Sequence, residues 1–282
     1  MNAWPAPAKL NLFLHITGRR ADGYHDLQTI FQFLDWCDEL VITPRADGQI
    51  LRHGGLAEVP PEADLVVRAA RRLQAHSGCR LGADIDLRKR IPAGGGLGGG
   101  SSDAATVLHA LNRLWSLDLP GPELARLGLG LGADVPVFLL GHAAFGAGVG
   151  EILTPVEPDT PWYLILHPAG AVSTAEIFNA PELTRSTPAT TIARFFSTPE
   201  AHGNDCEPVV LTRYPVIAAA HRWLGQHAPA RLTGTGACVF AAFGNESVAR
   251  GVFARRPAGL EGFVARGLNR SPLIEKLSER SD

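Results

Sequence analysis

The chain has 282 residues, of which 45% are hydrophobic and 19% charged, so it can build one large or two modest globular domains and is not a disordered protein. Its 26 basic and 28 acidic residues nearly cancel and form no basic stripe, which disfavours nucleic acid or an anionic membrane as a partner and favours small molecules. The four cysteines show no C-x-x-C pairing, and the chain shows no signal-peptide pattern and no bilayer-length apolar run, so we expect a cytoplasmic protein with reduced thiols.

The first half of the chain is predicted to be rich in strands. Alternation of apolar and polar residues predicts strands over 9–16, 27–36, 38–45 and 82–92. Apolar residues at helical spacing predict amphipathic helices over 63–76 and 101–115, and a shorter helix over 122–131. The apolar run that follows, "GADVPVFLLG", contains a single carboxylate, Asp134.

The pattern changes near residue 146, where a second half begins. Strands are predicted over 148–156, 161–168 and 261–269, and a strand, a glycine turn and a second strand over 231–244. Helices are predicted over 173–178, 208–227 and 246–257. We therefore expect an α+β fold of two lobes, an N-terminal domain over 1–150 and a C-terminal domain over 151–282, with the ligand between them.

The densest glycine stretch is "IPAGGGLGGGSSDAA", residues 91–105, with six glycines in seven positions. It follows a predicted strand and opens a predicted helix, where Ser101 and Ser102 suit the cap region and Asp103 suits the first turn. Backbone N–H groups at such a helix start, together with the positive end of the helix dipole, bind phosphate. The alternatives are a flexible linker or a purely structural turn, and the patterned elements on both sides favour the phosphate site.

Two common phosphate loops do not fit this stretch. The Walker A pattern requires a lysine that "GGGLGGGSS" lacks. Gly94, Gly96 and Gly99 match the dinucleotide-binding pattern G-x-G-x-x-G. However, the helix predicted over 101–115 is not followed by an apolar strand that ends in an acidic residue, which that fold requires. A phosphate site built from this loop would therefore belong to another class of phosphate-binding protein.

Five residues outside the loop are candidates for chemistry, and each has an ordinary structural alternative. Phosphoryl transfer requires a group that orients or deprotonates the attacking hydroxyl, and Asp134 suits this role, but it also suits a helix cap. Lys9 begins an alternating strand, and a lysine at an exposed strand end is its ordinary explanation. Asn11 shares the same face, and a side chain that fills the interior is its alternative. Tyr24 and His25 lie in a turn-rich "GYH" segment, where packing alone would account for Tyr24 and a surface position for His25.

The stretch "PAGGGLGGGSSDAA" resembles the phosphate loop of the GHMP kinases. The segments "PAKLNLFLHITGRRADGYHDLQTIF", "LGADVPVFLLGHAAFGAGVGE" and "RLTGTGACVF" resemble one branch of that family, which phosphorylates a cytidine-diphosphate conjugate of methylerythritol. The resemblance covers nearly the whole chain. It implies the two-lobed GHMP kinase fold, ATP and Mg²⁺ as cofactors, and transfer to the 2-hydroxyl of the erythritol part in non-mevalonate isoprenoid precursor synthesis.

The resemblance also implies roles for individual residues. It implies that Lys9 and Asp134 are catalytic and that Asn11 hydrogen-bonds the substrate. It implies that Tyr24 and Phe178 stack on cytosine, which offers an aromatic face, and that His25 and Thr174 lie beside the substrate. The turn over 234–240 is expected to close on the phosphates. The ATP phosphates are expected on Pro92, Ala93, Gly94, Gly95, Gly96, Leu97, Gly98, Gly99, Gly100, Ser101 and Ser102.

The chain departs from the family pattern at the metal. Some GHMP kinases hold Mg²⁺ with a helix-borne glutamate, and no matching glutamate is evident here, so the metal ligands stay open, with phosphate oxygens, water and Ser102 as candidates. The segment Asn204 to Pro208 also resembles the family, but its residues indicate no role. Two alternatives remain: a homoserine-type or mevalonate-type kinase, which would not need Tyr24 and His25, and a nucleotide-binding regulator without catalysis, which would not need Lys9 and Asp134.

Overall fold

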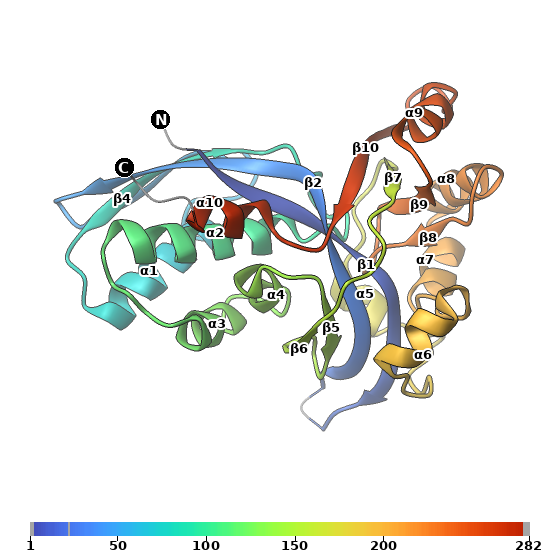
Figure 1. Cartoon of the computed structure of the whole chain (residues 1–282), viewed down its shortest axis with the longest axis horizontal. Coiled ribbons are helices and arrows are strands. Elements are labelled where there is room, and N and C mark those ends of the chain that lie inside the picture. The colour runs from blue at the N-terminus through green and yellow to red at the C-terminus, as the bar shows by residue number, and fades with distance from the viewer. Residues whose placement is uncertain (1–2, 22, 279–282) are drawn as a thin grey trace.

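The computed structural model describes residues 3–21 and 23–278, whose strands join into one ten-stranded sheet (Figure 1). The strands are β1 (Ala3–Arg19), β2 (His25–Arg45), β3 (Ile50–Gly54), β4 (Gly82–Arg88), β5 (Ala144–Ala147), β6 (Ile152–Pro155), β7 (Trp162–His167), β8 (Arg231–Leu232), β9 (Val239–Phe243) and β10 (Glu261–Leu268). The helices are α1 (Leu65–Ser77), α2 (Gly99–Leu114), α3 (Gly121–Leu129), α4 (Val135–Leu140), α5 (Thr174–Phe178), α6 (Ile192–Ser197), the 3₁₀ turn η1 (Pro199–Ala201), α7 (Glu207–Arg213), α8 (Pro215–Gly225), α9 (Glu246–Ala254) and α10 (Pro272–Ser278).

Two long antiparallel strands, β1 and β2, run through both parts of the molecule (Figure 1). The sheet order is β3-β4-β2-β10-β7-β9-β8, and β2 also pairs with β1 and β5. The prediction of separate strands over 27–36 and 38–45 was wrong, because β2 continues through both. Pro7 of β1 pairs with Cys37 and Ala6 with Asp38, so neighbouring strands hold the intervening residues in extended form.

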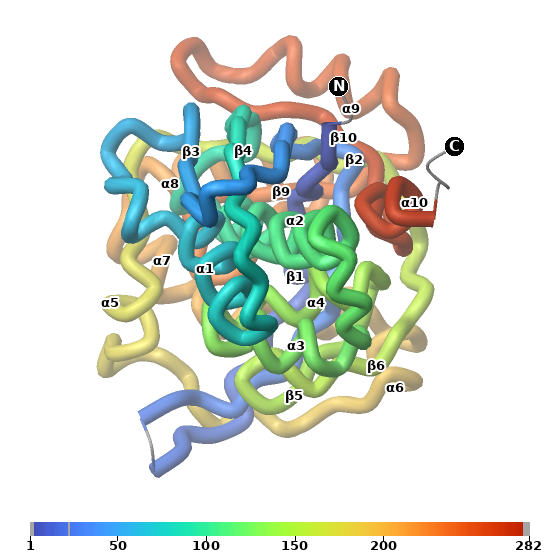
Figure 2. Tube along the Cα trace, turned by 90° about the vertical axis from the view of Figure 1, so that its left-hand side faces the viewer, coloured from blue at the N-terminus to red at the C-terminus, as the bar shows by residue number. Residues whose placement is uncertain are grey.

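Helices α1 to α4 lie together on one side of the N-terminal strands (Figure 2). Their apolar faces and those of β2 and β4 share one core, which includes Phe33, Ile85 and Leu108. Leu273 of α10 joins this core, so the end of the chain returns to the N-terminal lobe. The boundary at residue 150 stays a prediction.

The second lobe contains strands β7 to β10 and helices α5 to α9 (Figure 1). The single helix predicted over 208–227 is two helices, because Tyr214 is non-helical (φ −122°, ψ 86°) and Pro215 starts α8. Proline disfavours helical geometry in the residue before it and lacks an N–H, so the break follows from the sequence itself. The strand predicted over 148–156 is shorter than expected, because residues 148–151 form a turn after β5 and only β6, Ile152–Pro155, lies within the predicted range.

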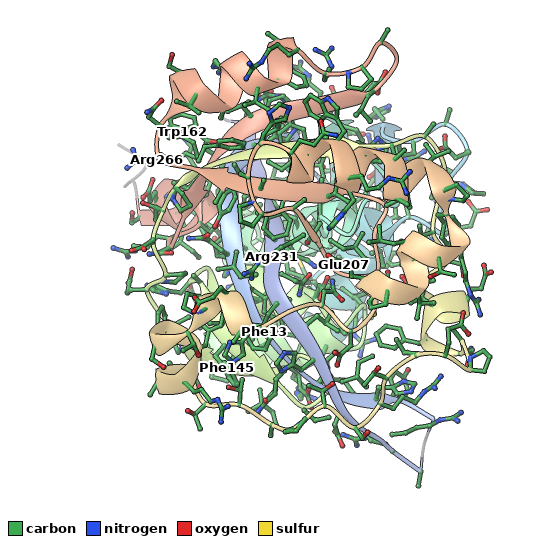
Figure 3. All side chains as sticks on the ribbon, turned by 90° about the vertical axis from the view of Figure 1, so that its right-hand side faces the viewer. Phe13, Phe145, Trp162, Glu207, Arg231 and Arg266 are labelled. Atoms are coloured by element: carbon green, nitrogen blue, oxygen red, sulfur yellow. The ribbon has the colours of Figure 1, made fainter. Side chains whose placement is uncertain are left out.

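A third core lies between the lobes and is formed by β1, β2, β7, β9 and β10. It contains Leu10, Ile30, Phe240 and Leu97 of the glycine loop. Phe13 of β1 reaches Phe145 of β5 in the same cluster, with ring centroids 6.2 Å apart (Figure 3). The predicted α+β, two-lobed architecture is confirmed, and no helix among the described residues is long and apolar enough to cross a membrane.

Candidate active site

The glycine loop connects β4 to α2, as predicted, and both lobes hold it. The N–H of Lys9 donates to Leu97 O at 3.0 Å, which joins the loop to β1. From the second lobe, the N–H groups of Ala237 and Cys238 donate to Gly94 O and Gly95 O at 3.1 and 3.2 Å. The loop ends at α2, whose first-turn amides have no intrahelical acceptor and are available to an anion.

Neighbouring protein atoms leave no room for side chains at three of these glycines. A Cβ at Gly96 would lie 2.3 Å from Thr233 O, and one at Gly95 would lie 2.6 Å from Cys238 Sγ. A Cβ at Gly98 would lie 2.9 Å from the Phe138 ring, and the φ angles of Gly96 and Gly98 are positive, at 73° and 72°. Part of the glycine requirement is therefore internal to the protein, whereas Gly100, whose Cβ would meet only Leu65 at 3.5 Å, faces no such limit.

Lys9 and Asp134 form an ion pair at the junction of the lobes, with Nζ and Oδ2 3.2 Å apart. The lysine side chain is 3% exposed and the aspartate side chain 35%, so the ammonium is buried while the carboxylate faces open space. Lys9 Nζ also donates to Asn11 Oδ1 at 2.5 Å. The structure thus brings the two predicted catalytic residues and Asn11 together.

Asp134 precedes α4 but does not cap it. Its backbone is helical (φ −83°, ψ −12°) and its side chain makes no capping hydrogen bond, while Pro136 occupies the first turn, where its missing N–H does no harm. The capping alternative is therefore wrong for this side chain.

A hydrogen-bond chain fixes the orientation of Asn11. Its side-chain amide donates to Thr29 Oγ1 at 2.9 Å, and Thr29 Oγ1 in turn donates to Phe13 O at 2.5 Å. Its backbone N–H donates to Thr233 Oγ1 at 3.0 Å. With its amide so oriented, Asn11 presents Oδ1 to Lys9. Thr29 of β2 and Thr233, which follows β8, are residues that the sequence did not single out, because a threonine at such places carries no distinguishing pattern.

A cavity of about 740 Å³ opens above this pair. It holds every predicted substrate residue, and its lining includes Lys9, Asn11, Tyr24, His25, Asp134, Thr174 and Phe178, with Gly96, Gly98 and Ser101 from the loop. Tyr24 is 64% exposed, whereas His25 is buried and its ring stacks on Phe178 with centroids 5.3 Å apart. Thr174 Oγ1 lies 2.9 Å from Thr235 Oγ1. Thr235, which belongs to the turn over 234–240 expected on the phosphates, also lines the cavity, as do Leu14 and Asn179, which were missed.

A second cavity of about 390 Å³ adjoins the first along the loop and shares Gly96, Gly98 and Ser101 with it. Its lining includes the loop from Pro92 to Ser101, together with Lys89 and Asp103. Ser102 lines neither cavity, and its buried hydroxyl has no hydrogen-bond partner among the described residues. The loop therefore separates two adjoining spaces.

A buried charge cluster supports the loop where it joins α2. Lys89 Nζ bonds Asp38 and lies 2.6 Å from Asp103 Oδ2. Asp38 also accepts from the N–H groups of Arg90 and Ile91. Burial raises the pKa of Asp103 to about 8. The positive charge of Lys89 lowers this pKa, and the negative charge of Asp38 raises it. Neither aspartate was predicted from the sequence to support the loop.

The segment Asn204 to Pro208, for which the sequence indicated no role, fastens the glycine turn of the second lobe to β1. Asn204 Nδ2 donates to Leu232 O and Gly234 O at 2.9 and 2.8 Å. Asp205 accepts from Ile16 N at 2.6 Å. Glu207, close to Arg231 in Figure 3, accepts from Leu232 N at 2.6 Å. The segment holds the turn that contacts the loop.

Among the described residues, no three histidine, cysteine, aspartate or glutamate side chains are grouped to hold a metal ion. The four cysteines are free. Burial raises the pKa of the Cys206 thiol to about 12, so it stays protonated at neutral pH.

Comparison with known proteins gives a consistent result. Residues 64–142 match the description "GHMP kinases N terminal domain" and residues 198–260 match "GHMP kinases C terminal". The chain is 57% identical over 279 residues to a 4-diphosphocytidyl-2-C-methyl-D-erythritol kinase of Alkalilimnicola ehrlichii, covering 99% of this chain and 95% of that protein. It is 55% identical over 278 residues to the Shewanella loihica protein of the same name, covering 98% and 97%.

Solved structures show the same relationship. A crystal structure of a 4-(cytidine 5'-diphospho)-2C-methyl-D-erythritol kinase superposes with a TM-score of 0.83 at 30% identity, covering 94% of this chain and 99% of that one. A mevalonate kinase superposes with a TM-score of 0.69 at 17% identity, covering 96% and 100%, and this likeness concerns the fold alone. The chain belongs to the GHMP kinase family, in the group of the 4-diphosphocytidyl-2-C-methyl-D-erythritol kinases.

Proposed function

We propose that this protein transfers the γ-phosphoryl group of ATP to the 2-hydroxyl of 4-diphosphocytidyl-2-C-methyl-D-erythritol, a step in the non-mevalonate synthesis of isoprenoid precursors. The observation that carries the proposal is the Lys9–Asp134 pair, 3.2 Å apart, on the wall of a cavity that the glycine loop borders. The names of the relatives at 55–58% identity agree with this activity, and they disfavour the mevalonate and homoserine alternatives. A regulator without catalysis would not require the pair.

The two cavities suit the two substrates. The smaller one follows the loop and the start of α2, where N–H groups suit the phosphates of ATP. The larger one has aromatic and polar side chains from both lobes, which suit a base and a sugar alcohol. Since Gly96, Gly98 and Ser101 border both cavities, the γ-phosphate and the acceptor hydroxyl meet near Lys9 and Asp134.

In the proposed reaction Asp134 accepts the proton of the 2-hydroxyl as its oxygen attacks the γ-phosphorus. The bond between the γ-phosphorus and the oxygen that bridges to the β-phosphate breaks, and ADP leaves with that oxygen. Lys9 stabilises the negative charge that develops between the acceptor oxygen and the phosphoryl group. Asn11 holds the ammonium of Lys9 in place through its hydrogen bond of 2.5 Å.

Mg²⁺ is proposed to arrive with the nucleotide. The described residues offer no carboxylate cluster for a resident ion, which suits a metal held mainly by phosphate oxygens and water. The Ser102 hydroxyl is buried and has no hydrogen-bond partner among the described residues, but it lines neither cavity, so no protein ligand is assigned to this ion. When bound, the metal neutralises phosphate charge.

The proposed function is tested by ATP turnover against a panel of acceptors. The panel contains 4-diphosphocytidyl-2-C-methyl-D-erythritol, the same sugar alcohol without the cytidine part, mevalonate and homoserine. We expect turnover with the first alone and a new phosphate monoester at carbon 2 by ³¹P NMR. Equal turnover of mevalonate or homoserine would contradict the proposal, and so would the absence of turnover with all four acceptors.

A further inference from the structure

A single arginine from the second lobe holds the imidazole of His25 in one orientation. Arg185 lies between α5 and α6, and its Nε donates to His25 Nε2 at 3.1 Å. Its other nitrogens donate to three backbone carbonyl groups of the same segment, those of Leu183, Phe178 and Ala180, at 3.1, 2.9 and 2.6 Å. The guanidinium plane is therefore fixed.

This contact determines the tautomer of His25. A guanidinium nitrogen can only donate a hydrogen bond, so His25 Nε2 must carry a lone pair and the ring proton must be on Nδ1. Burial lowers the pKa of His25, and the positive charges of Arg185 and Arg19 lower it further. The ring is accordingly a neutral imidazole with Nδ1–H as its one N–H donor.

His25 is 7% exposed and lines the larger cavity beside Tyr24 and Phe178. Its ring stacks on Phe178 with an interplanar angle of 24°, so two contacts from the second lobe limit its rotation. An N–H donor fixed in this way distinguishes pyrimidines. The N3 atom of cytosine accepts a hydrogen bond, whereas N3 of uracil carries a proton and donates one.

We propose that Arg185 is a positioning residue that makes the acceptor cavity selective for cytosine over uracil, by holding His25 as the Nδ1–H tautomer so that it donates to cytosine N3. This inference rests on the proposed function, because it takes the larger cavity as the site of the cytidine part. Arg185 itself does not contact the base. Its effect is on the choice between bases, not on phosphoryl transfer.

The first test is the tautomer in the unchanged protein. Imidazole ¹⁵N NMR at pH 8 should show His25 Nδ1 protonated and Nε2 unprotonated, with the His25 signals assigned by their loss in His25→Gln. An Nε2–H tautomer or an even mixture would overturn the inference. This measurement does not depend on any Arg185 variant folding.

The second test is binding of CDP and UDP by calorimetry, without ATP. Because an unmatched buried hydrogen bond is costly, the protein should prefer CDP by about 5- to 100-fold. Arg185→Met should reduce this preference to within about threefold, and Arg185→Lys, which keeps a donor, should restore part of it. The matched control is Arg213→Met, since Arg213 binds Glu182 and Glu176 of the same region and does not contact His25. It should keep the preference.

The outcomes separate this inference from the proposed function. If the unchanged protein turned over the cytidine conjugate but bound CDP and UDP equally, or if Arg185→Met kept the preference, Arg185 would have no role in selectivity and the kinase activity would stand. If the protein bound CDP selectively but did not turn over the conjugate, the proposed function would fail and the role of Arg185 would stand. A loss of CDP preference in Arg213→Met equal to that in Arg185→Met would show a general loosening of the segment and would overturn the inference.

Discussion

Replacing Asp134 with asparagine separates proton transfer from positioning. Asparagine keeps the shape of the side chain and can still accept a hydrogen bond, but it cannot take the proton of the acceptor hydroxyl. General-base catalysis contributes about 10²- to 10⁴-fold, so we expect kcat to fall by that factor, which corresponds to about 2.7–5.4 kcal/mol in the activation free energy. KM for both substrates should change by no more than a few fold.

The structure also bounds the cost to stability. Asp134 makes no capping bond, its side chain is 35% exposed, and Lys9 keeps its bond to Asn11 when the carboxylate is removed. Breaking a fully buried ion pair costs about 3–5 kcal/mol, and the exposure of Asp134 reduces this to about 1 kcal/mol. Such a change lowers Tm by only about 2–4 °C.

The assay is steady-state kinetics with both substrates, together with calorimetric unfolding. Lys9→Met and the double variant complete the set, and the double variant should lose less than the product of the single losses, because the two groups act on one oxygen. Near-normal kcat in Asp134→Asn would refute the base assignment. A large fall in Tm with loss of both substrates would instead show that the aspartate is structural.

Three further predictions follow from the same geometry. Gly100→Val should weaken ATP binding, measured by calorimetry, with little change in Tm, because a Cβ at Gly100 meets only Leu65 at 3.5 Å. Gly96→Ala should lower Tm sharply, because a Cβ at Gly96 would lie 2.3 Å from Thr233 O. Equal effects of the two substitutions on Tm would contradict this. Tyr24→Ala should raise KM for the cytidine substrate about 5- to 150-fold and leave KM for ATP unchanged, since a lost stacking partner costs about 1–3 kcal/mol and a 64% exposed ring contributes little to the core; an equal rise in both KM values would show a general effect on the lobes. Because the pKa of Asp103 is raised to about 8, the folded protein binds a proton that the unfolded chain does not, so the free energy of unfolding falls as pH rises from about 4 to 8. In denaturant titrations Asp103→Asn should flatten this decline, whereas Asp38→Asn, which loses bonds to Lys89, Arg90 and Ile91, should lower the free energy of unfolding at every pH. A decline in Asp103→Asn parallel to that of the unchanged protein would contradict the assignment.

The elements that the sequence predicted well are those with local signals. The helix over 101–115 appears as Gly99–Leu114, because its apolar spacing is local. The expected cap by Ser101 or Ser102 was wrong, because Gly98 precedes the helix and no side chain caps it. The break at Tyr214 and Pro215 was also in the sequence, since a proline in a helical pattern ends the helix before it, and that signal was overlooked.

The continuity of β2 could not be predicted in this way. The stretch around Asp35 and Asp38 resembles a turn, yet Asp38 is fully buried because it accepts from the backbone of Arg90 and Ile91 and bonds Lys89. These partners are about fifty residues away along the chain. Long-range pairing overrides local preference here, and only the fold shows it.

The residues of the candidate site also fall into two groups, those with a local signal in the sequence and those without one. The glycine loop stands out by composition, whereas Lys9 and Asp134 had ordinary structural alternatives and were assigned catalytic roles through the resemblance to the GHMP kinases. Thr29, Thr233 and Arg185 act through bonds to atoms that lie far away in sequence, and threonine or arginine at such places is common. Distances, not composition, single them out.

The position of the loop explains why the site lies between the lobes. Its carbonyl groups accept from Ala237 and Cys238 of one lobe, and Leu97 O accepts from Lys9 of the other. Lys9 thus holds the loop with its backbone and pairs with Asp134 through its side chain, so one residue positions both the amides that we propose bind phosphate and the carboxylate that we propose faces the acceptor. A displacement of the glycine turn, which Asn204 holds through two carbonyls, would shift the donor cradle relative to Asp134. Because a misplacement of about 1 Å can cost 10²-fold in rate, residues that never contact a substrate, such as Asn204, should affect kcat before they affect binding.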